Sequence, residues 1–492
     1  MMLAARVAAL LLVLPVTLGA VTDETPPPPA DASAAEAEAP DADDKVVKTK
    51  SMLKNLRFAE DWSALADPDV ETDHWFPGIK HVEFGEDWTA SFGGQVRVRT
   101  MVEQNRALTG AVPGHNDFSL LRTRLHGDFR FRDDMRVFVE VLSASIYGNS
   151  PVKPLGIDNQ HLDLENAFVE IFGELFGKAT ALRFGRTELQ YGKQRLISPL
   201  DWANTRRRFE GAVFQIKGEN VTTDFFLVHP VGTTARRADE SNSSLAFAGV
   251  YTTIKIDDKH TMDVFGLILD ESDPVLTNGA GMMGNRELYT VGGRYDGKAG
   301  GTDYEVWGAR QFGDHAGDDI TGYAYSARAG QTFASLPGSP RVGIDFDVAS
   351  GDPDPTDGEM ETFQQLFPLG HAYFGYLDLI GRQNIISVMP NVTVKLGSTA
   401  AFRASYSKFT LNNRHDALYG ASGAGPLVDP TGMSGDSVGS EIDLTLVWAP
   451  PCTAPHGKFL FGWSQFKPDR FVETLGDGNR AELLYAQYSF TF

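Results

Sequence analysis

Hydrophobic and polar positions alternate along much of the chain, and the pattern is clearest at its end. In residues 481–492, one face carries Leu484, Ala486, Tyr488, Phe490 and Phe492, and the other carries Leu483, Tyr485, Gln487, Ser489 and Thr491. A period of two places these sets on opposite faces of a β-strand, and about ten residues suffice to cross a bilayer. The pattern predicts the closing strand of a transmembrane barrel, although a soluble β protein can end in the same way.

Turn-forming residues divide the rest of the chain into further alternating segments, of which the first three are residues 90–100, 118–132 and 135–145. Short connections are predicted at 133–134, 173–179, 218–220, 257–259, 297–301, 336–340, 397–398 and 449–456. Longer ones are predicted at 146–162, 191–208, 232–244, 271–286, 349–382, 411–438 and 468–478. Short and long connections alternate, as periplasmic turns and extracellular loops do in bacterial barrels. The prediction is an all-β fold, a transmembrane antiparallel up-and-down β-barrel of about 18 strands.

The alternation also predicts which side chains face the lumen. In residues 118–132, one face carries Leu121, Thr123, Leu125, Gly127, Phe129 and Phe131, and the other carries Arg122, Arg124, His126, Asp128, Arg130 and Arg132. Because arginine is costly against lipid, the second face is expected to line the lumen. The same phase points eight further charged residues inward: Arg97, Arg99, Arg136, Glu140, Arg183, Arg294, Arg328 and Arg403.

An arginine-rich lumen has two interpretations, which the sequence leaves open. Fixed guanidiniums lower the barrier for anions and suit carboxylates or phosphates. Alternatively, the arginines pair with luminal acids and stiffen the wall. Neither a metal site nor a cofactor is predicted, because His126 is interpreted as a polar wall residue and the acidic residues near Asp352 lack the spacing of a calcium loop.

Composition and the N-terminus set the organisation of the chain. Hydrophobic residues make up 42% of it, and no later stretch matches the apolar run at the start, which excludes a helical membrane protein. The expected parts are a signal peptide at 1–20, a disordered tether at 21–50, a periplasmic segment at 51–84 and the barrel at 85–492. Residues 45–73 are expected to form a short helix or lid, or to extend the tether. The net charge of −21 lies largely in the tether and in residues 345–361.

Two internal segments resemble the alginate-export family of outer-membrane porins. Residues 183–211 read RFGRTELQYGKQRLISPLDWANTRRRFEG, and residues 347–384 contain VASGD followed by TFQQLFPLGHAYFGYLDLIGRQN. Residues 56–63, LRFAEDWS, and 84–99, FGEDWTASFGGQVRVR, add to the likeness, which extends from about residue 53 to the end and fits a broad branch of the family. The resemblance implies a monomeric barrel of about 18 strands whose arginine-lined constriction passes a polyanionic polysaccharide.

The resemblance also implies particular site residues. The first block matches the family at Gly185, Arg186, Tyr191, Gly192, Arg195, Trp202, Asn204, Arg207, Phe209, Glu210 and Gly211. The second block matches at Ser350, Gly351, Asp352, Thr362, Phe363, Phe367, His371, Gly375, Asp378 and Asn384. Arg186, Arg195, Asn204 and Arg207 are taken as pore-lining, and Asp352, Phe363, Phe367, His371 and Asp378 as a constriction loop. That second block is apolar enough to fold against the rim or into the lumen, but a surface loop packing its own side chains is the alternative.

These observations predict an outer-membrane channel for an anionic oligo- or polysaccharide. The alternatives are a porin for small anionic nutrients, a sealed adhesin-like barrel, and a hydrolase built on His371 and Ser387, although no motif fixes that pair. No catalytic residue is therefore predicted. The expected partners are outer-membrane lipid, the saccharide, the barrel-assembly machinery and periplasmic export components, with no nucleic acid.

Overall fold

The computed structural model describes residues 46–47, 49–109, 114–148, 156–272 and 281–492. The predicted signal peptide and nearly all of the predicted tether lie outside the described residues. None of the helices in these ranges is long and apolar enough to cross a membrane.

The described chain forms a closed antiparallel barrel of 18 strands, as predicted. Its staves are β4 (Trp88–Gln104), β5 (His115–Phe131), β6 (Met135–Tyr147), β7 (Gln160–Leu175), β8 (Lys178–Thr187), β9 (Phe209–Lys217), β10 (Val221–Pro230), β11 (Leu245–Lys255), β12 (His260–Glu271), β13 (Arg286–Ala299), β14 (Thr302–His315), β16 (Tyr323–Thr332), β17 (Arg341–Ala349), β19 (Ile385–Leu396), β20 (Ala400–Leu411), β21 (Ser437–Trp448), β22 (Gly457–Pro468) and β23 (Ala481–Thr491). The last strand pairs with the first, with Gln487 opposite Arg99 and Ser489 opposite Arg97. This is the closure that the terminal alternation predicts.

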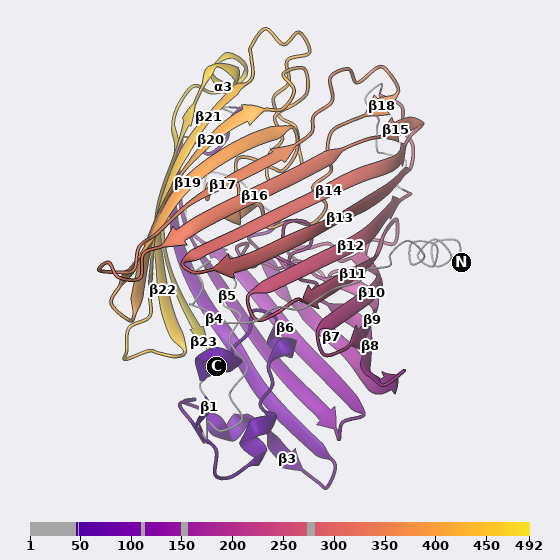
Figure 1. Ribbon diagram of the computed structural model, residues 1–492, viewed down its shortest axis with the longest axis vertical. Coiled ribbons are helices and arrows are strands. Elements are labelled where there is room, and N and C mark those ends of the chain that lie inside the picture. Colours follow the sequence, from indigo (N-terminus) through magenta and orange to yellow (C-terminus); the bar gives the residue numbers. More distant parts are fainter. Residues whose placement is uncertain (1–45, 48, 110–113, 149–155, 273–280) are drawn as a thin grey trace.

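Smaller elements lie at the two ends of the barrel. At one end are β1 (Val46–Val47), α2 (Thr49–Met52), η1 (Arg57–Ala59), η2 (Ser63–Ala66), β2 (Glu71–Thr72), η3 (Pro77–Ile79) and β3 (Val82–Phe84), and in the loops of the other end are β15 (Asp318–Ile320), β18 (Glu359–Met360), η4 (Gly370–Ala372) and α3 (Arg470–Leu475). Figure 1 shows α3, β15 and β18 at one end, and β1, β3 and the C-terminus at the other. The first end carries the long loops and the second the short turns, which are periplasmic in bacterial barrels.

One long-end connection is absent from the prediction. Residues 316–322 separate β14 from β16, where the sequence pattern gives no break between 301 and 336. Ala316 and Gly317 turn the chain there with φ of 52° and 95°, and β15 then pairs with β18 of the loop after β17. A tight turn followed by a strand-like triplet is hard to distinguish from a continuous strand by alternation alone.

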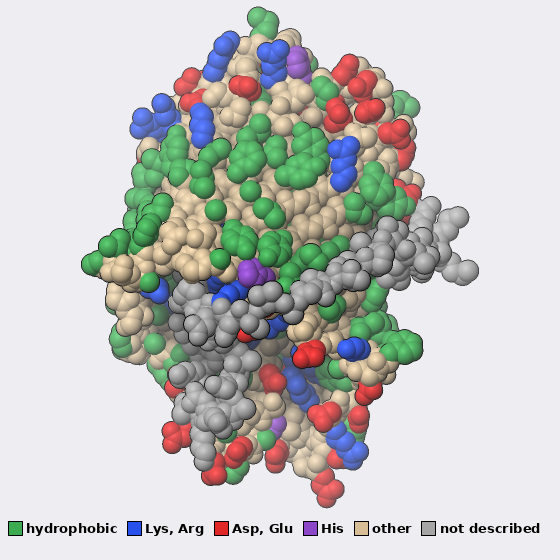
Figure 2. Space-filling model, viewed as in Figure 1, with side chains coloured by type: hydrophobic (Ala, Val, Ile, Leu, Met, Phe, Trp, Pro, Cys, Tyr) green, Lys and Arg blue, Asp and Glu red, His purple; other side chains and the backbone are tan. Residues whose placement is uncertain are grey.

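The two faces of the wall separate apolar from charged side chains. Val98, Leu125, Val306, Ile344 and Leu484 point outward, and each is between 43% and 55% exposed. Hydrophobic side chains form a band across the visible wall, and charged side chains gather beyond its edges (Figure 2). On the opposite face of β5, Arg122, Arg124 and His126 are buried. The two faces of this strand thus differ in burial in the way that the predicted phase requires.

The core of the molecule lies inside the barrel. Inward residues of the wall, such as Phe209, Phe247 and Leu288, form one buried cluster with Leu196 and Ile197 of loop 188–208 and with Phe363 and Phe374 of loop 350–384. Loop 350–384 hydrogen-bonds to loop 188–208 through Phe367 N–H and the Leu196 carbonyl at 2.9 Å. The second block thus folds into the lumen, which was one of the two interpretations of its apolar sequence.

Candidate functional site: the luminal constriction

Three inward arginines lie close together on the first two staves, and only one of them pairs with a carboxylate. Arg97 on β4 lies directly opposite Arg122 on β5, and Arg99 follows on the same face of β4. Asp201 of loop 188–208 accepts a hydrogen bond from Arg122 Nη2 on its carboxylate at 2.7 Å, whereas Arg97 Nη1 reaches only the Asp201 backbone carbonyl, at 2.6 Å. Within the described residues, neither Arg97 nor Arg99 forms an ion pair with a carboxylate. This part of the wall therefore keeps an excess of positive charge.

Most other luminal arginines are neutralised by neighbouring acids. Arg124 pairs with Glu140 at 2.9 Å and with Glu188 at 3.4 Å, and Arg195 bridges Glu305 at 2.8 Å and Asp347 at 3.0 Å. The remaining pairs join Arg136 to Asp128 and Glu170, Arg183 to Glu170, Arg130 to Asp128, Arg294 to Asp263 and Asp296, and Arg328 to Asp345. For these residues, the structural interpretation of the arginine-rich lumen describes the wall better than a free positive ladder does.

A stack of four side chains joins the arginine wall to both inward loops. The Arg99 guanidinium lies 3.6 Å from the centre of the Trp202 ring. The His371 ring stacks on the same Trp202 ring, with 3.7 Å between the two ring centres. Tyr376 stacks next on His371 at 4.2 Å. His371 Nδ1 also contacts the Asp378 carboxylate at 3.2 Å. A cation over an aromatic face is stabilised without a counter-ion, so Arg99 keeps its charge while Trp202 holds it in place.

The predicted loop residues have distinct places in this arrangement. Asn204 Nδ2 donates to the carbonyls of Leu121, Ser145 and Asp158, which pins loop 188–208 to the wall. Arg207 Nη1 donates to the carbonyls of Ser198 and Pro368, and so joins the two loops. Phe367 packs against Phe209 and Phe247, whereas Phe363 is fully buried nearer the rim. Burial lowers the pKa of Arg207 to about 10.

Two predicted residues have their contacts away from the stack at Arg99. Arg186 lies three positions after Arg183, so alternation places it on the other face of β8, and it pairs with Glu210, opposite it on β9, at 3.2 Å. Asp352 joins another loop, since its backbone N–H donates to the Asp416 carboxylate at 3.0 Å. Arg403, in contrast, shares the inward face of β20 with buried Ser405 and Ser407.

Several charged residues at the constriction escaped the sequence prediction. Arg206 pairs with Glu188 and Asp201, Arg208 with Asp239 and Glu165, and Arg382 with Asp347. The run of three arginines at 206–208 is a visible signal, but its partners come from distant segments.

His371 and Ser387, the pair that a hydrolase would need, share no hydrogen bond in the described part of the chain. Nor do the described residues bring together three side chains of the kinds that bind a metal ion.

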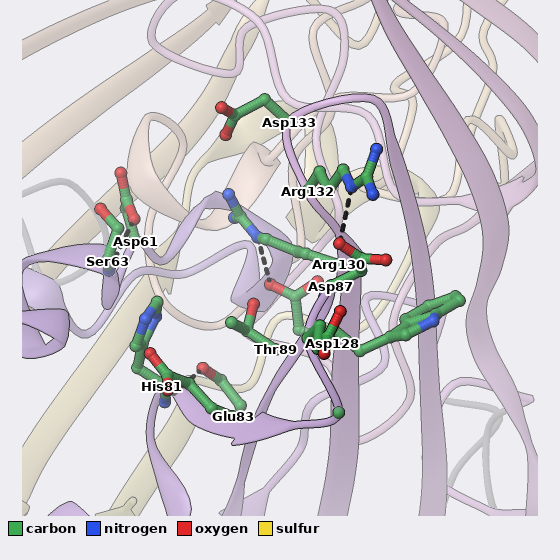
Figure 3. A pocket seen from close by; sticks show the side chains of 14 residues that line it. Asp61, Ser63, His81, Glu83, Asp87, Thr89, Asp128, Arg130, Arg132 and Asp133 are labelled. Carbon is green, nitrogen blue, oxygen red and sulfur yellow. Dashed lines mark hydrogen bonds and ion pairs between the residues drawn. The ribbon is translucent and has the colours of Figure 1, made fainter.

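A vestibule opens at the short-turn end. This cavity of about 330 Å³ lies between residues 61–87 and the start of β4 and the end of β5. Figure 3 shows Arg130 paired with Asp128 and Arg132 with Asp87, at 3.3 Å and 2.7 Å. Asp61, Glu83, Glu86 and Asp133 also line the cavity. The vestibule is acidic, so any preference for anions has to arise deeper in the lumen.

We expect the contact between loops 350–384 and 412–436 to weaken as the pH rises. Burial raises the pKa of Asp352 from 3.8 to about 6, and burial also raises the pKa of Asp416. Below pH 3.8, Asp352 is protonated whether the loops are packed or apart, so it imposes no penalty. Between pH 3.8 and 6 the separated loop ionises first, which progressively disfavours packing, and above pH 6 the penalty is constant.

Limited proteolysis across this pH range, with a protease active throughout, measures the effect. Cleavage within 350–384 should be slower near pH 4.5 than near pH 7.5. D352N keeps an acceptor for the Asp354 N–H and should reduce the difference. D436N, at an exposed position of loop 412–436, serves as the control and should leave the difference unchanged.

The chain is similar to known proteins in sequence and in fold. The sequence model of a family described as alginate export matches residues 88–485. No curated protein matches the sequence. Among solved structures, Pseudomonas aeruginosa OccK2 (OpdF), in complex with glucuronate, is similar with a TM-score of 0.56 at 12% identity, over 82% of this chain and 98% of that one. OccD3 (OpdP) and OccK3 (OpdO) of the same organism each give a TM-score of 0.52, at 10% and 12% identity, over 82% of this chain and 91% and 95% of theirs.

Proposed function

Since the chain belongs to the alginate-export family and is an outer-membrane β-barrel channel, we propose that the solute it passes is an acidic saccharide. The observation that carries the proposal is the shortage of carboxylates at the constriction. Of Arg97, Arg99 and Arg122, only Arg122 forms an ion pair within the described structure, and its partner Asp201 also pairs with Arg206. Arg99 Nη2 is buried and has no hydrogen-bond partner in the described structure, so it is a donor aimed at no protein acceptor.

The chemistry of these groups suits a carboxylated sugar. A planar guanidinium offers paired N–H donors that match a carboxylate, and an aromatic ring beside it offers an apolar face. Trp202 and Tyr485 supply such rings next to Arg99, at the centre of the inward wall. Because the vestibule is acidic, we propose that the charge preference is set at Arg97 and Arg99 rather than at the periplasmic mouth.

The second candidate is uptake of small uronates or related anionic nutrients. Two loops fold into the lumen and share one hydrophobic core with the wall. The space that they occupy is lost to the solute, which favours a small solute. The likeness to OccK2, solved with glucuronate, is consistent with that alternative. A polymer needs a wider and continuous path than a monosaccharide does, so transport assays with saccharides of increasing length would separate the two candidates.

Ion selectivity in planar bilayers tests the proposal. The native channel should show a reversal potential that favours chloride over potassium, and the double variant R97Q/R99Q should lose most of that preference because the constriction then lacks its excess charge. R132Q removes one arginine at an exposed turn and should change nothing. Polyuronate or glucuronate should reduce the native current and leave the double variant largely unaffected. A native channel without anion preference would contradict the proposal.

A further inference from the structure

We propose that residues 53–62 form a plug that occupies the periplasmic half of the lumen and must be displaced before solute can pass. Leu56 and Phe58 of this segment pack against the inward side chains of Phe138 and Phe168, and Arg57 and Glu60 are buried beside them. Residues 53–62 are called the plug below. The inference concerns opening and does not depend on which solute the channel carries.

Phe58 is seated in an aromatic pocket of the wall. Its ring lies 5.9 Å from that of Phe138 on β6 and 5.4 Å from that of Phe168 on β7, in edge-to-face arrangements. The Arg183 guanidinium lies 4.3 Å from the Phe58 ring. All three partners belong to the inward face, so Phe58 occupies space that an open channel would leave to water and solute. Burying such a ring favours the closed state.

Arg57 and the backbone of Phe58 attach the plug to the wall by polar contacts. Arg57 is 3% exposed, and its Nη2 donates to the carbonyl of Phe492, the last residue, at 3.0 Å. Its Nη1 pairs with Glu60 at 2.6 Å inside the plug itself. Arg136 Nη2 donates to the Phe58 carbonyl at 2.7 Å. The plug therefore contacts both β6 and Phe492, the residue that follows the closing strand β23, along one side of the wall.

The upper end of the plug reaches the inward loop. Asn55 Nδ2 donates to Gln190 Oε1 at 2.8 Å, and Arg206 Nη1 donates to Asn55 Oδ1 at 3.2 Å. Both partners belong to loop 188–208, which also carries Trp202. A segment that enters from the periplasmic end thus meets a loop that enters from the opposite end, and the two together span the lumen.

The way in which the plug is held favours displacement over permanent packing. Its backbone hydrogen bonds are local, such as Ala59 N–H to the Leu56 carbonyl at 2.9 Å, and no ladder pairs described plug residues with a stave. Within the described structure, side-chain contacts hold it to the wall and to loop 188–208, including those of Arg136 and Arg206 with plug carbonyls, so leaving does not unpair any strand. Farther along the chain, β3 pairs with β4 and would keep the displaced plug attached to the mouth. The vestibule adjoins the plug at Asp61 and is open space beside it.

Bilayer recordings on the full chain test the plug. R57Q/F58A removes the contact with Phe492 and the aromatic anchor, and should raise the open fraction about tenfold, with chloride and potassium as the only solutes. F84A, which truncates a 44% exposed phenylalanine on β3, is the matched control and should leave gating unchanged. Heat-dependent migration in gels confirms that each variant forms a barrel.

A reversible lock makes the test independent of destabilisation. With exposed Cys452 changed to serine, F58C and F138C are joined by a short bis-methanethiosulfonate linker, which forms a disulfide with each cysteine as methanesulfinate leaves and is cleaved by a reductant. The linked channel should stay closed, and adding reductant should restore current. The inference is overturned if R57Q/F58A conducts as the native channel does, or if linked and reduced channels conduct equally. Failure of the saccharide proposal would instead appear as an unchanged ion preference in R97Q/R99Q, whatever the plug does.

Discussion

Replacing Arg208 with methionine is expected to lower the free energy of unfolding by about 3–5 kcal/mol, because it leaves two buried carboxylates without a counter-ion. The Arg208 side chain is fully buried, as are those of Glu165 on β7 and Asp239 in loop 231–244, with which it pairs. Methionine fills similar space but supplies no charge and no donor. Urea titration of the barrel in detergent, followed by tryptophan fluorescence, measures the loss.

Companion variants separate charge from packing in this prediction. R208M combined with E165Q and D239N has no stranded charge and should regain most of the lost stability. R130Q removes one member of an ion pair whose arginine side chain is 34% exposed, and should cost at most about 1 kcal/mol. If R208M and R130Q lowered the free energy of unfolding by equally small amounts, the ion pairs of Arg208 would not hold loop 231–244 to the wall.

Replacing Trp202 with alanine is expected to release both inward loops from the arginine wall and to increase single-channel conductance severalfold. Trp202 is the one side chain that touches Arg99 on β4 and His371 in loop 350–384 within the stack of four. Truncating a packed tryptophan costs about 3–5 kcal/mol of local packing. Amide hydrogen exchange in 350–384 should accelerate together with the rise in conductance.

A second tryptophan provides the control for that experiment. Trp448 on β21 is 40% exposed on the outer face and stacks on Phe459 at 5.5 Å. W448A removes the same number of atoms from the lipid side and should change neither loop exchange nor conductance. If W202A gave native conductance with faster loop exchange, the plug alone would limit the current.

Arg186 shows where family likeness and local physics give different expectations. The matched block implies a place in the pore, whereas its odd spacing from Arg183 on one strand puts the two on opposite faces. The sequence pattern missed the connection at 316–322 for the opposite reason. There the local pattern is itself ambiguous, and pairing between β15 and β18 across 40 residues of sequence decides the structure.

The sequence by itself determined the barrel, its approximate strand number and the inward phase of Arg97, Arg122 and Arg124, because alternation and the cost of arginine in lipid are properties of each strand alone. It could not show which arginines stay uncompensated. Arg195 meets Asp347 across 152 positions of sequence, and Arg124 meets Glu188 across 64. The tertiary structure decided this. Which arginines are neutralised, and what occupies the lumen, depends on where the long loops and residues 53–62 fold back into the barrel. The closed barrel provides the confined space that brings these segments together.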